Sequence, residues 1–125
     1  MKKVISTESA PAAVGPYSQG IRVGGFLFIS GQVGLDPATG EMVEGLEKQV
    51  EMAISNVKAV VEAAGGEIGN IVKTTVLLQS IDDFKTMNGI YNRFFSENHP
   101  ARAAFEVAKL PLGALVEIEA VAYLD

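Results

Sequence analysis

The 125-residue chain contains no cysteine and a single histidine, His99. Without thiols there is no disulfide, no thiolate nucleophile and no zinc site of the usual cysteine and histidine kind. A lone histidine also disfavours a serine-histidine catalytic triad. Chemistry must therefore rest on carboxylates, arginine, hydroxyls and backbone groups, and the sequence offers no obvious metal site.

Positive charge is also scarce, since the chain has 10 Lys and Arg residues against 15 Asp and Glu residues, which gives a net charge of -5. The charge that neutralises nucleic-acid phosphates has no clustered source here, so we expect no nucleic-acid partner. No apolar run approaches the roughly 18 residues that span a bilayer. Polar residues soon follow the basic start Met1-Lys2-Lys3, so we expect no export signal, no membrane association and a cytoplasmic location.

The first half of the chain changes from strand to helix patterning. With 48% apolar residues, residues 1–125 are expected to form one domain with one core. The apolar run 26–31 predicts a buried strand, with 20–23 pairing to it as a hairpin through Gly24-Gly25. Apolar residues spaced by three and four over 46–64 predict an amphipathic helix that Gly65-Gly66 ends.

The second half repeats the alternation. Residues 71–79 are rich in β-branched side chains and predict a strand. Asp82 is a candidate N-cap for a second helix that ends at His99-Pro100. The apolar stripe of that helix comprises Phe84, Met87, Tyr91, Phe94 and Phe95. We expect the last two strands, 103–109 and 114–124, to form a hairpin around Pro111-Leu112-Gly113.

Two helices lying between strands predict crossover connections, and hence an α+β fold with a single mixed sheet and both helices on one face. In the last strand one alternating set of side chains suits the surface under the helices. The other set mixes apolar bulk with two charges, and comprises Leu115, Glu117, Glu119, Val121 and Tyr123. Because this second face would expose a large apolar patch, we expect a homo-oligomer that covers it.

Arg102 and the carboxylates downstream of it are the candidate chemical groups. A guanidinium binds a carboxylate through two parallel hydrogen bonds, which lysine does not reproduce. A carboxylate nearby, Glu117 or Glu119, would serve as an acid or base. On residue chemistry alone, an exposed ion pair at Arg102 and a solvated strand face at Glu117 and Glu119 remain open alternatives.

Several short motifs, taken together and in this order, resemble the Rid (YjgF) family and in particular its RidA branch. The resemblance runs from about Ser6 to the C-terminus. The motifs are Gly15-Pro16-Tyr17-Ser18-Gln19-Gly20, Ser30-Gly31-Gln32, Ile71-Val72-Lys73-Thr74-Thr75-Val76, Asn88 with Tyr91, Pro100-Ala101-Arg102, Leu110-Pro111 and Val116-Glu117-Ile118-Glu119-Ala120.

The resemblance implies a fold similar to the bacterial chorismate mutase type and a homotrimer with clefts between subunits. It also implies a cofactor-free deaminase that hydrolyses 2-iminobutanoate and 2-iminopropanoate to 2-oxobutanoate and pyruvate plus ammonia. Arg102 would bind the substrate carboxylate, and Glu117 would activate water. The implied pocket lining is Tyr17, Ser30, Gly31, Phe84, Asn88 and the backbone of Ala104.

The chain departs from the family pattern directly after the arginine, where Ala103 and Ala104 replace frequent Ser and Cys residues. Activity should fall if those side chains contribute, and should change little if only the backbone of Ala104 does. Two other functions stay open: a regulatory protein that senses a small carboxylate, and the RNA-cleaving or translation-inhibiting activity ascribed to some family members. The acidic balance disfavours the latter.

Overall fold

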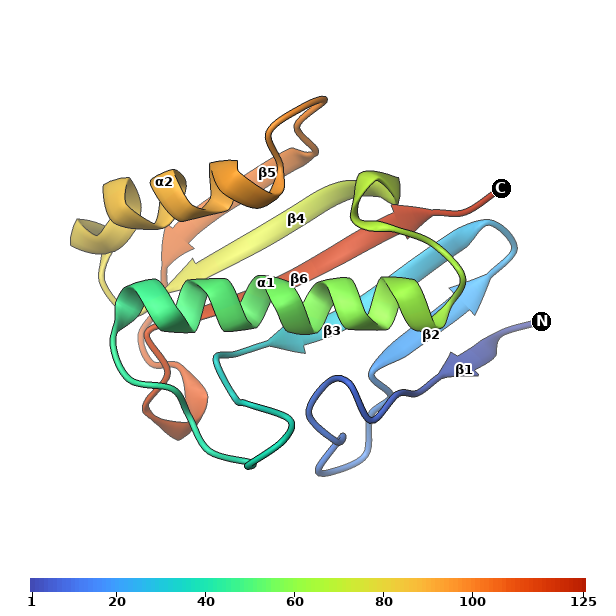
Figure 1. Cartoon of the computed structure of the whole chain (residues 1–125), viewed down its shortest axis with the longest axis horizontal. Helices are drawn as coiled ribbons and strands as arrows, with labels where there is room; N and C mark the ends of the chain where they lie inside the picture. The colour runs from blue at the N-terminus through green and yellow to red at the C-terminus, as the bar shows by residue number, and fades with distance from the viewer.

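The computed structural model describes residues 1–125 and shows a six-stranded sheet with both α-helices on one face (Figure 1). The main elements are β1 (Lys3–Ile5), β2 (Gly20–Val23), β3 (Phe26–Gln32), α1 (Leu46–Ala63), β4 (Ile71–Leu78), α2 (Phe84–Phe94), β5 (Ala101–Glu106) and β6 (Val116–Tyr123). Three short 3-10 turns lie at Ile68–Asn70 (η1), Ile81–Asp83 (η2) and Pro111–Gly113 (η3). The predicted α+β class with a single mixed sheet is confirmed.

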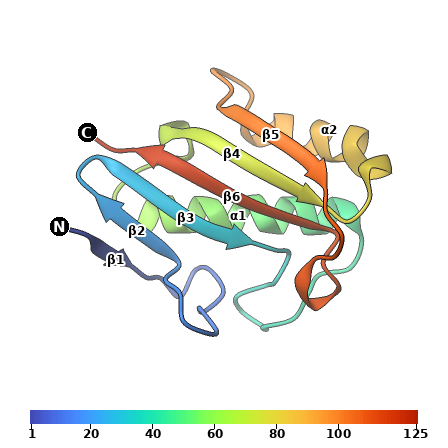
Figure 2. The ribbon, with the colours of Figure 1, turned by 180° about the vertical axis from the view of Figure 1, so that it is seen from behind.

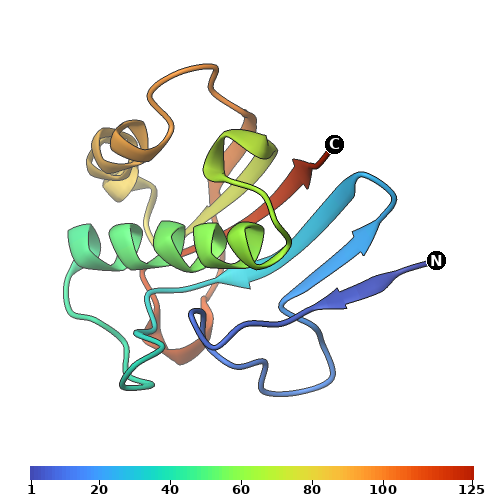
Figure 3. The same cartoon turned by 45° about the vertical axis from the view of Figure 1, so that its right-hand side comes forward.

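The sheet order is β1-β2-β3-β6-β4-β5, and every neighbouring pair is antiparallel except β4 with β5. Helix α1 connects β3 to β4 and α2 connects β4 to β5, so each makes the crossover that places a helix over the sheet. Figure 3 shows the two helices side by side on that face, and Figure 2 shows the opposite face without a covering layer.

Helix α1 forms because its apolar side chains repeat at the helical period. Val50, Ile54, Val57 and Val61 are all buried against the sheet and α2. The helix ends as predicted, because Gly65 adopts a φ of +90° that a side chain would strain. The next amide, that of Gly66, donates to the Val61 carbonyl at 3.0 Å and satisfies one of the last carbonyl groups.

The predicted hairpin between the last two strands is wrong. Strand β5 pairs in parallel with β4, whereas β6 lies between β3 and β4 in the middle of the sheet. The turn at Pro111–Gly113 does form, but it belongs to a connection over 107–115 that crosses the end of β4. A connection of that length easily spans the two strand spacings, roughly 10 Å, that separate β5 from β6.

Several boundaries also differ from the prediction. The second helix ends at Phe94 and not at His99-Pro100, because Phe95 leaves the helical region with φ -117° and ψ 61°. Strand β5 ends at Glu106 and not at 109, and β6 spans Val116–Tyr123 and not 114–124. Strand β5 begins at Ala101, so Arg102 lies within the strand and not before it. Asp82 does not cap the second helix, because residues 81–83 form an extra 3-10 turn and the Ser80 hydroxyl accepts from the Asp82 amide at 3.2 Å. Strand β1, which pairs with β2 at the sheet edge, was not predicted; its three residues are too few to show a period.

The alternation predicted for the last strand is confirmed. Val116, Ile118, Ala120, Ala122 and Leu124 are buried beneath the helices. On the open face Tyr123 packs edge-on against Phe26 with ring centroids 5.2 Å apart, yet 46% of Tyr123 and 48% of Phe26 remain exposed. A neighbouring aromatic, Phe28, is 49% exposed. The open face therefore carries the apolar patch that the sequence predicts. No helix has the length and apolar character needed to cross a membrane.

Candidate active site

Arg102 lies on the helix-covered side of the sheet. Its strand β5 pairs with β4 so that Arg102 is in register with Thr74, whose side chain is fully buried beneath α2. The Arg102 guanidinium carbon lies 4.9 Å from the centre of the Tyr91 ring and 5.5 Å from that of Phe84. Nη1 of Arg102 also donates to Oδ1 of Asn88 at 2.8 Å. One amide and two rings therefore hold the guanidinium while its other N–H donors remain free.

Phe84, Asn88 and Tyr91 reach Arg102 because they occupy one face of α2, at positions i, i+4 and i+7. The 3-10 turn η2, which leads into this helix, is tied to β5 by Glu106, whose Oε1 accepts from the Ile81 amide at 2.9 Å. The groove beside the guanidinium is lined by Asn88, Tyr91, Asn92, His99, Pro100 and Arg102. The predicted residues Phe84 and Asn88 are therefore beside Arg102.

Ala104 lies two residues beyond Arg102 on the same face of the edge strand β5. The Val107 amide donates inward to the Leu78 carbonyl at 2.9 Å. Because bonding alternates along a parallel pair, Ala103 and Phe105 also bond inward, whereas the amide and carbonyl of Ala104 point to the free edge. The backbone of Ala104 is thus available to a ligand that Arg102 holds.

Glu117 lies on the opposite face, which the helices leave open. It is in register with Leu77 of β4 and is half-buried. Burial raises the pKa of the Glu117 carboxyl above its usual value, and the nearby Glu119 carboxylate raises it further. A raised pKa suits a group that must both accept and return protons near neutral pH.

Gly31 makes room for the Glu117 carboxyl group. A Cβ atom at Gly31 would lie 2.9 Å from Cδ and 3.1 Å from Cγ of Glu117. The contact arises from a bulge in β3, since Ile29 opposes Ala120 and Gln32 opposes Ile118, which leaves Ser30 and Gly31 opposite one residue, Glu119.

Ser30 and Tyr17 complete the side of the groove near Glu117. The Ser30 hydroxyl donates to the Ser18 carbonyl, and the Ser30 amide donates to the Gln19 carbonyl at 2.9 Å. Ser30 thereby ties the loop that carries Tyr17 to the edge of the groove. The groove around Glu117 is lined by residues that include Tyr17, Ser30, Gly31, Leu112 and Glu119.

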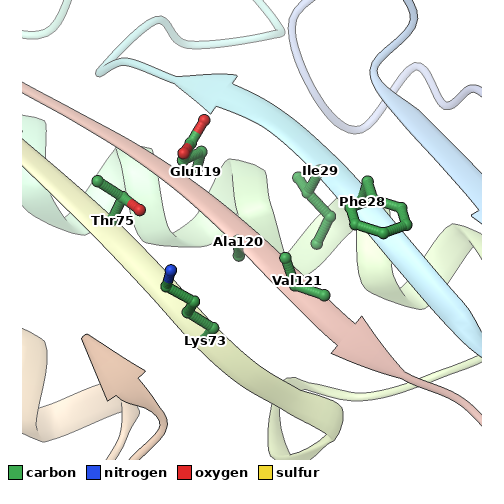
Figure 4. Close-up of a pocket in the computed structure, with 7 residues that line it drawn as sticks. All are labelled: Phe28, Ile29, Lys73, Thr75, Glu119, Ala120 and Val121. Carbon is green, nitrogen blue, oxygen red and sulfur yellow. The ribbon is translucent and has the colours of Figure 1, made fainter. Parts of the chain in front are cut away.

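Further along the open face, Lys73 and Thr75 of β4 and Glu119 and Val121 of β6 surround a shallow pocket (Figure 4). Thr75 and Glu119 are in register, and Lys73 is in register with Val121. Glu119 is exposed and shares its face with Glu117, so its clearest effect within one chain is electrostatic.

The predicted site residues thus form two groups that one chain does not bring together. Arg102, Phe84, Asn88 and Ala104 lie on the helix side near the β5 edge, as the packing of Arg102 on α2 shows. Tyr17, Ser30, Gly31 and Glu117 line the groove on the open face. One group contains the expected carboxylate-binding residue, Arg102, and the other contains the expected acid-base residue, Glu117.

Sequence reasoning missed Tyr91 and Thr74 as parts of the Arg102 group. The sequence predicts Tyr91 in the apolar stripe of a helix and Thr74 in a strand, and both side chains are indeed buried. The spacing of Tyr91 from Phe84 and Asn88 held the available signal, since it puts all three on one helix face. The register of β4 with β5, which places Thr74 beside Arg102, was not readable from the sequence.

Comparison with known proteins agrees with the motifs. The family model described as Endoribonuclease L-PSP matches residues 7–124. The 2-iminobutanoate/2-iminopropanoate deaminase of Homo sapiens is 50% identical, over 98% of this chain and 90% of its own length. The enzyme of the same name from Salmonella typhimurium is 49% identical, over 98% of each chain. The crystal structure of E. coli TdcF with bound serine has a TM-score of 0.95 and 42% identity, covering 98% of this chain and 99% of that one.

These matches span almost the whole chain, and they agree with the order of motifs from Tyr17 to Glu117 and with the single mixed sheet. The resemblance to the Rid family is confirmed. The chain belongs to the Endoribonuclease L-PSP family, which is the family of the YjgF and Rid proteins.

Proposed function

We propose that this protein hydrolyses small 2-imino acids, 2-iminobutanoate and 2-iminopropanoate, to 2-oxobutanoate and pyruvate plus ammonia. The observation that carries the proposal is the state of the Arg102 guanidinium. Asn88 and the Tyr91 ring hold it in place, and its remaining N–H donors have no hydrogen-bond partner, so they can bind a carboxylate. The names of the human and Salmonella relatives support the substrate class. The serine bound to TdcF carries the carboxylate that such a site would recognise.

The reaction needs one water molecule and acid-base catalysis of the steps that form the C–O bond and break the C–N bond. Arg102 neutralises the substrate carboxylate beside the electrophilic carbon, so that carbon is easier to attack. Glu117 takes a proton from water as the oxygen bonds to the protonated imine carbon, and it returns that proton to the nitrogen. The C–N bond then breaks, and the hydroxyl proton passes to Glu117 as the C=O bond forms. Glu117 gives this proton to the departing ammonia, which leaves as ammonium, and the carboxylate is ready for another turnover. The water oxygen ends in the keto group.

We propose that the complete site lies between two copies of the chain, within a homotrimer. The exposed rings of Phe26, Phe28 and Tyr123 favour a partner over the open face. The two groups of site residues favour the same arrangement, since Arg102 of one copy could meet Glu117 of the next only across an interface. A closed ring gives every copy the same pair of contacts.

We place the reaction in the cytoplasm, where pyridoxal-phosphate enzymes release such imines, and we infer a protective role in clearing them. The direct test generates imines with an amino-acid oxidase and follows the rate of ketoacid formation. Arg102→Ala and Arg102→Lys should both abolish the acceleration, because lysine keeps the charge but not the two parallel bonds. Unchanged rates in both variants would contradict the proposed role of Arg102 in binding the substrate carboxylate.

A mixing experiment tests the shared site. Arg102→Ala and Glu117→Gln chains should each be inactive alone. Refolded together they should recover about a quarter of the wild-type activity, because random rings pair an intact arginine with an intact glutamate at that frequency. No recovery, in mixtures that light scattering shows to be mixed trimers, would mean that each chain builds its site alone.

The carboxylate-sensing alternative has its own signature. A sensor would bind 2-oxobutanoate through Arg102 without accelerating imine hydrolysis, and Glu117→Gln would leave that affinity nearly intact. Calorimetry beside the oxidase assay separates the two functions. RNA cleavage that persists in highly purified protein and responds to single substitutions would instead support the nuclease named in the family description.

A further inference from the structure

The hydroxyl groups of Tyr91 and Thr74 form a buried hydrogen bond directly beneath Arg102. The two oxygens are 2.7 Å apart, Tyr91 is 4% exposed and Thr74 is fully buried. Thr74 is in register with Arg102 on the adjacent strand, whereas Tyr91 comes from α2. The tyrosine ring therefore spans the space from helix to sheet, with its hydroxyl end fixed beside the strand that carries the arginine.

Arg102 rests on this ring. Its guanidinium carbon is 4.9 Å from the Tyr91 ring centre, a distance at which the electron-rich face attracts a cation. Phe95 packs against the same ring with centroids 4.5 Å apart, so the ring has a buried neighbour of its own. An arginine that is otherwise exposed is thereby supported by a residue that belongs to the core.

Ordering a long side chain is a real part of the free energy of binding. A free arginine loses rotamer freedom when it clamps a ligand, and an arginine already held in place loses less. The Asn88 bond holds one nitrogen of the guanidinium, and the Tyr91 ring lies against the guanidinium carbon. Tyr91 is held in turn by its packing against Phe95 and by the hydrogen bond between its hydroxyl and that of Thr74.

We propose that Tyr91 and Thr74 are positioning residues for Arg102, and that their hydroxyl bond fixes the ring which holds the guanidinium ready for a carboxylate. The proposal extends the proposed function by assigning a role to two residues outside the predicted site. Burial also raises the pKa of the Tyr91 hydroxyl, so it stays protonated and able to donate across the working pH range.

The test uses Tyr91→Phe and Thr74→Val, which remove one hydroxyl each and keep the size of the side chain. Calorimetry with 2-oxobutanoate should show affinity weakened about three- to tenfold in either variant, the range expected for one lost hydrogen bond. KM for the imine should rise by a similar factor while kcat changes less than about twofold, since Glu117 is untouched. Thr74→Ser keeps the hydroxyl and should retain the affinity.

Two comparisons separate positioning from general destabilisation. The double variant should bind no more weakly than the single ones, because both remove the same bond. Ile5→Val lowers stability at the far edge of the sheet and should leave affinity unchanged. Wild-type affinity and KM in folded Tyr91→Phe and Thr74→Val would overturn the proposal.

A readout without substrate separates this proposal from the proposed function. The chain has three arginines, and Arg102→Lys identifies the side-chain NMR signals of Arg102. Ring currents from Tyr91 should shift its Cδ protons upfield, and Tyr91→Phe and Thr74→Val should move them toward ordinary positions. Shifted signals that respond in this way, in a protein without deaminase activity, would reject only the proposed function. Signals that do not respond would reject the positioning role.

Discussion

Gly31 and Glu117 are in contact across β3 and β6, and the space that a Cβ atom would fill at Gly31 holds the Glu117 carboxyl group. Gly31 has no positive φ, so an alanine would meet no backbone strain and would act only through this contact. The effect of substitution at Gly31 is therefore a direct probe of the position of Glu117.

Gly31→Ala should lower kcat of imine hydrolysis at least about tenfold, because overpacking by one methyl group typically costs 1–3 kcal/mol or displaces the neighbour. The oxidase-coupled assay measures it. Gly89→Ala is the matched control, since its added methyl meets nothing within 4 Å and should stabilise α2 by roughly 0.5–1 kcal/mol. Equal activity in Gly31→Ala and wild type would show that Glu117 does not need its present position.

Glu119→Gln should lower the pKa of Glu117, because it removes the neighbouring charge that helps to raise it. Carbon NMR of the Glu117 carboxyl group, titrated in both proteins, measures the change. The pH at which kcat/KM rises should move down with it. If the titration curve of Glu117 is the same in Glu119→Gln and in wild type, burial alone raises the pKa of Glu117.

The same raised pKa predicts a pH dependence of stability. The folded chain binds the Glu117 proton more tightly than the unfolded chain, so this group's contribution to the free energy of unfolding decreases as pH rises from the usual glutamate pKa through the raised one. Glu117→Gln should remove that decrease, which urea unfolding across pH would detect. Glu62→Gln on the exposed side of α1 removes an equal charge and is the control.

Asn88→Asp should weaken 2-oxobutanoate binding about tenfold or more, because a carboxylate at this position would pair with Arg102 and compete with the ligand. Calorimetry tests it. Asn92→Asp adds the same charge one helical turn later, where the amide oxygen faces His99 at 3.0 Å and not Arg102. Similar losses in both variants would indicate a general effect of charge on the groove.

Ala104→Cys should change turnover less than about twofold, because the free amide and carbonyl of Ala104 are unaltered by its side chain. The assay is the one used for Arg102. A large gain in turnover would mean that the cysteine common in the RidA branch contributes through its sulfur. This chain would then lack a side chain that assists the reaction in other members of the branch.

Asn56→Ala should destabilise the fold by about 2–3 kcal/mol, because one buried and one partly buried carbonyl group lose their partner. The Asn56 amide donates to Val33 at 3.1 Å and to Leu35 at 2.8 Å, and so shapes one wall of the groove around Glu117. Urea unfolding measures the loss. Ser55→Ala, at the exposed neighbouring position, should change stability by less than about 0.5 kcal/mol.

The parts of the fold that follow a local period were predictable. The apolar stripe of α1 ended where Gly65 adopts its positive φ, and the β2–β3 hairpin closed at Gly24-Gly25. The alternation in β6 separated the buried Val116 and Ile118 from Glu117 correctly. Each of these features depends on residues within a few positions of one another.

The features that were predicted wrongly or not at all depend on contacts between segments that are distant in the sequence. A hairpin and a crossover connection share the same turn residues, so Pro111–Gly113 did not reveal that β6 lies between β3 and β4. For the same reason the sequence did not show that Arg102 and Glu117 face opposite sides of the sheet. The partners of Tyr91 were hidden because a tyrosine in an apolar stripe is usually just core.

Because of the bulge at Ser30 and Gly31, the number of residues in β3 affects the candidate site as well as the sheet. Deletion of one of these two residues would restore regular pairing with β6 and could strengthen the sheet. It would also remove either the anchor of the Tyr17 loop or the space for the Glu117 carboxyl group. Selection for a sturdier sheet and selection for turnover therefore act in opposite directions at this single extra residue, and relatives that lack it should be stable but inactive.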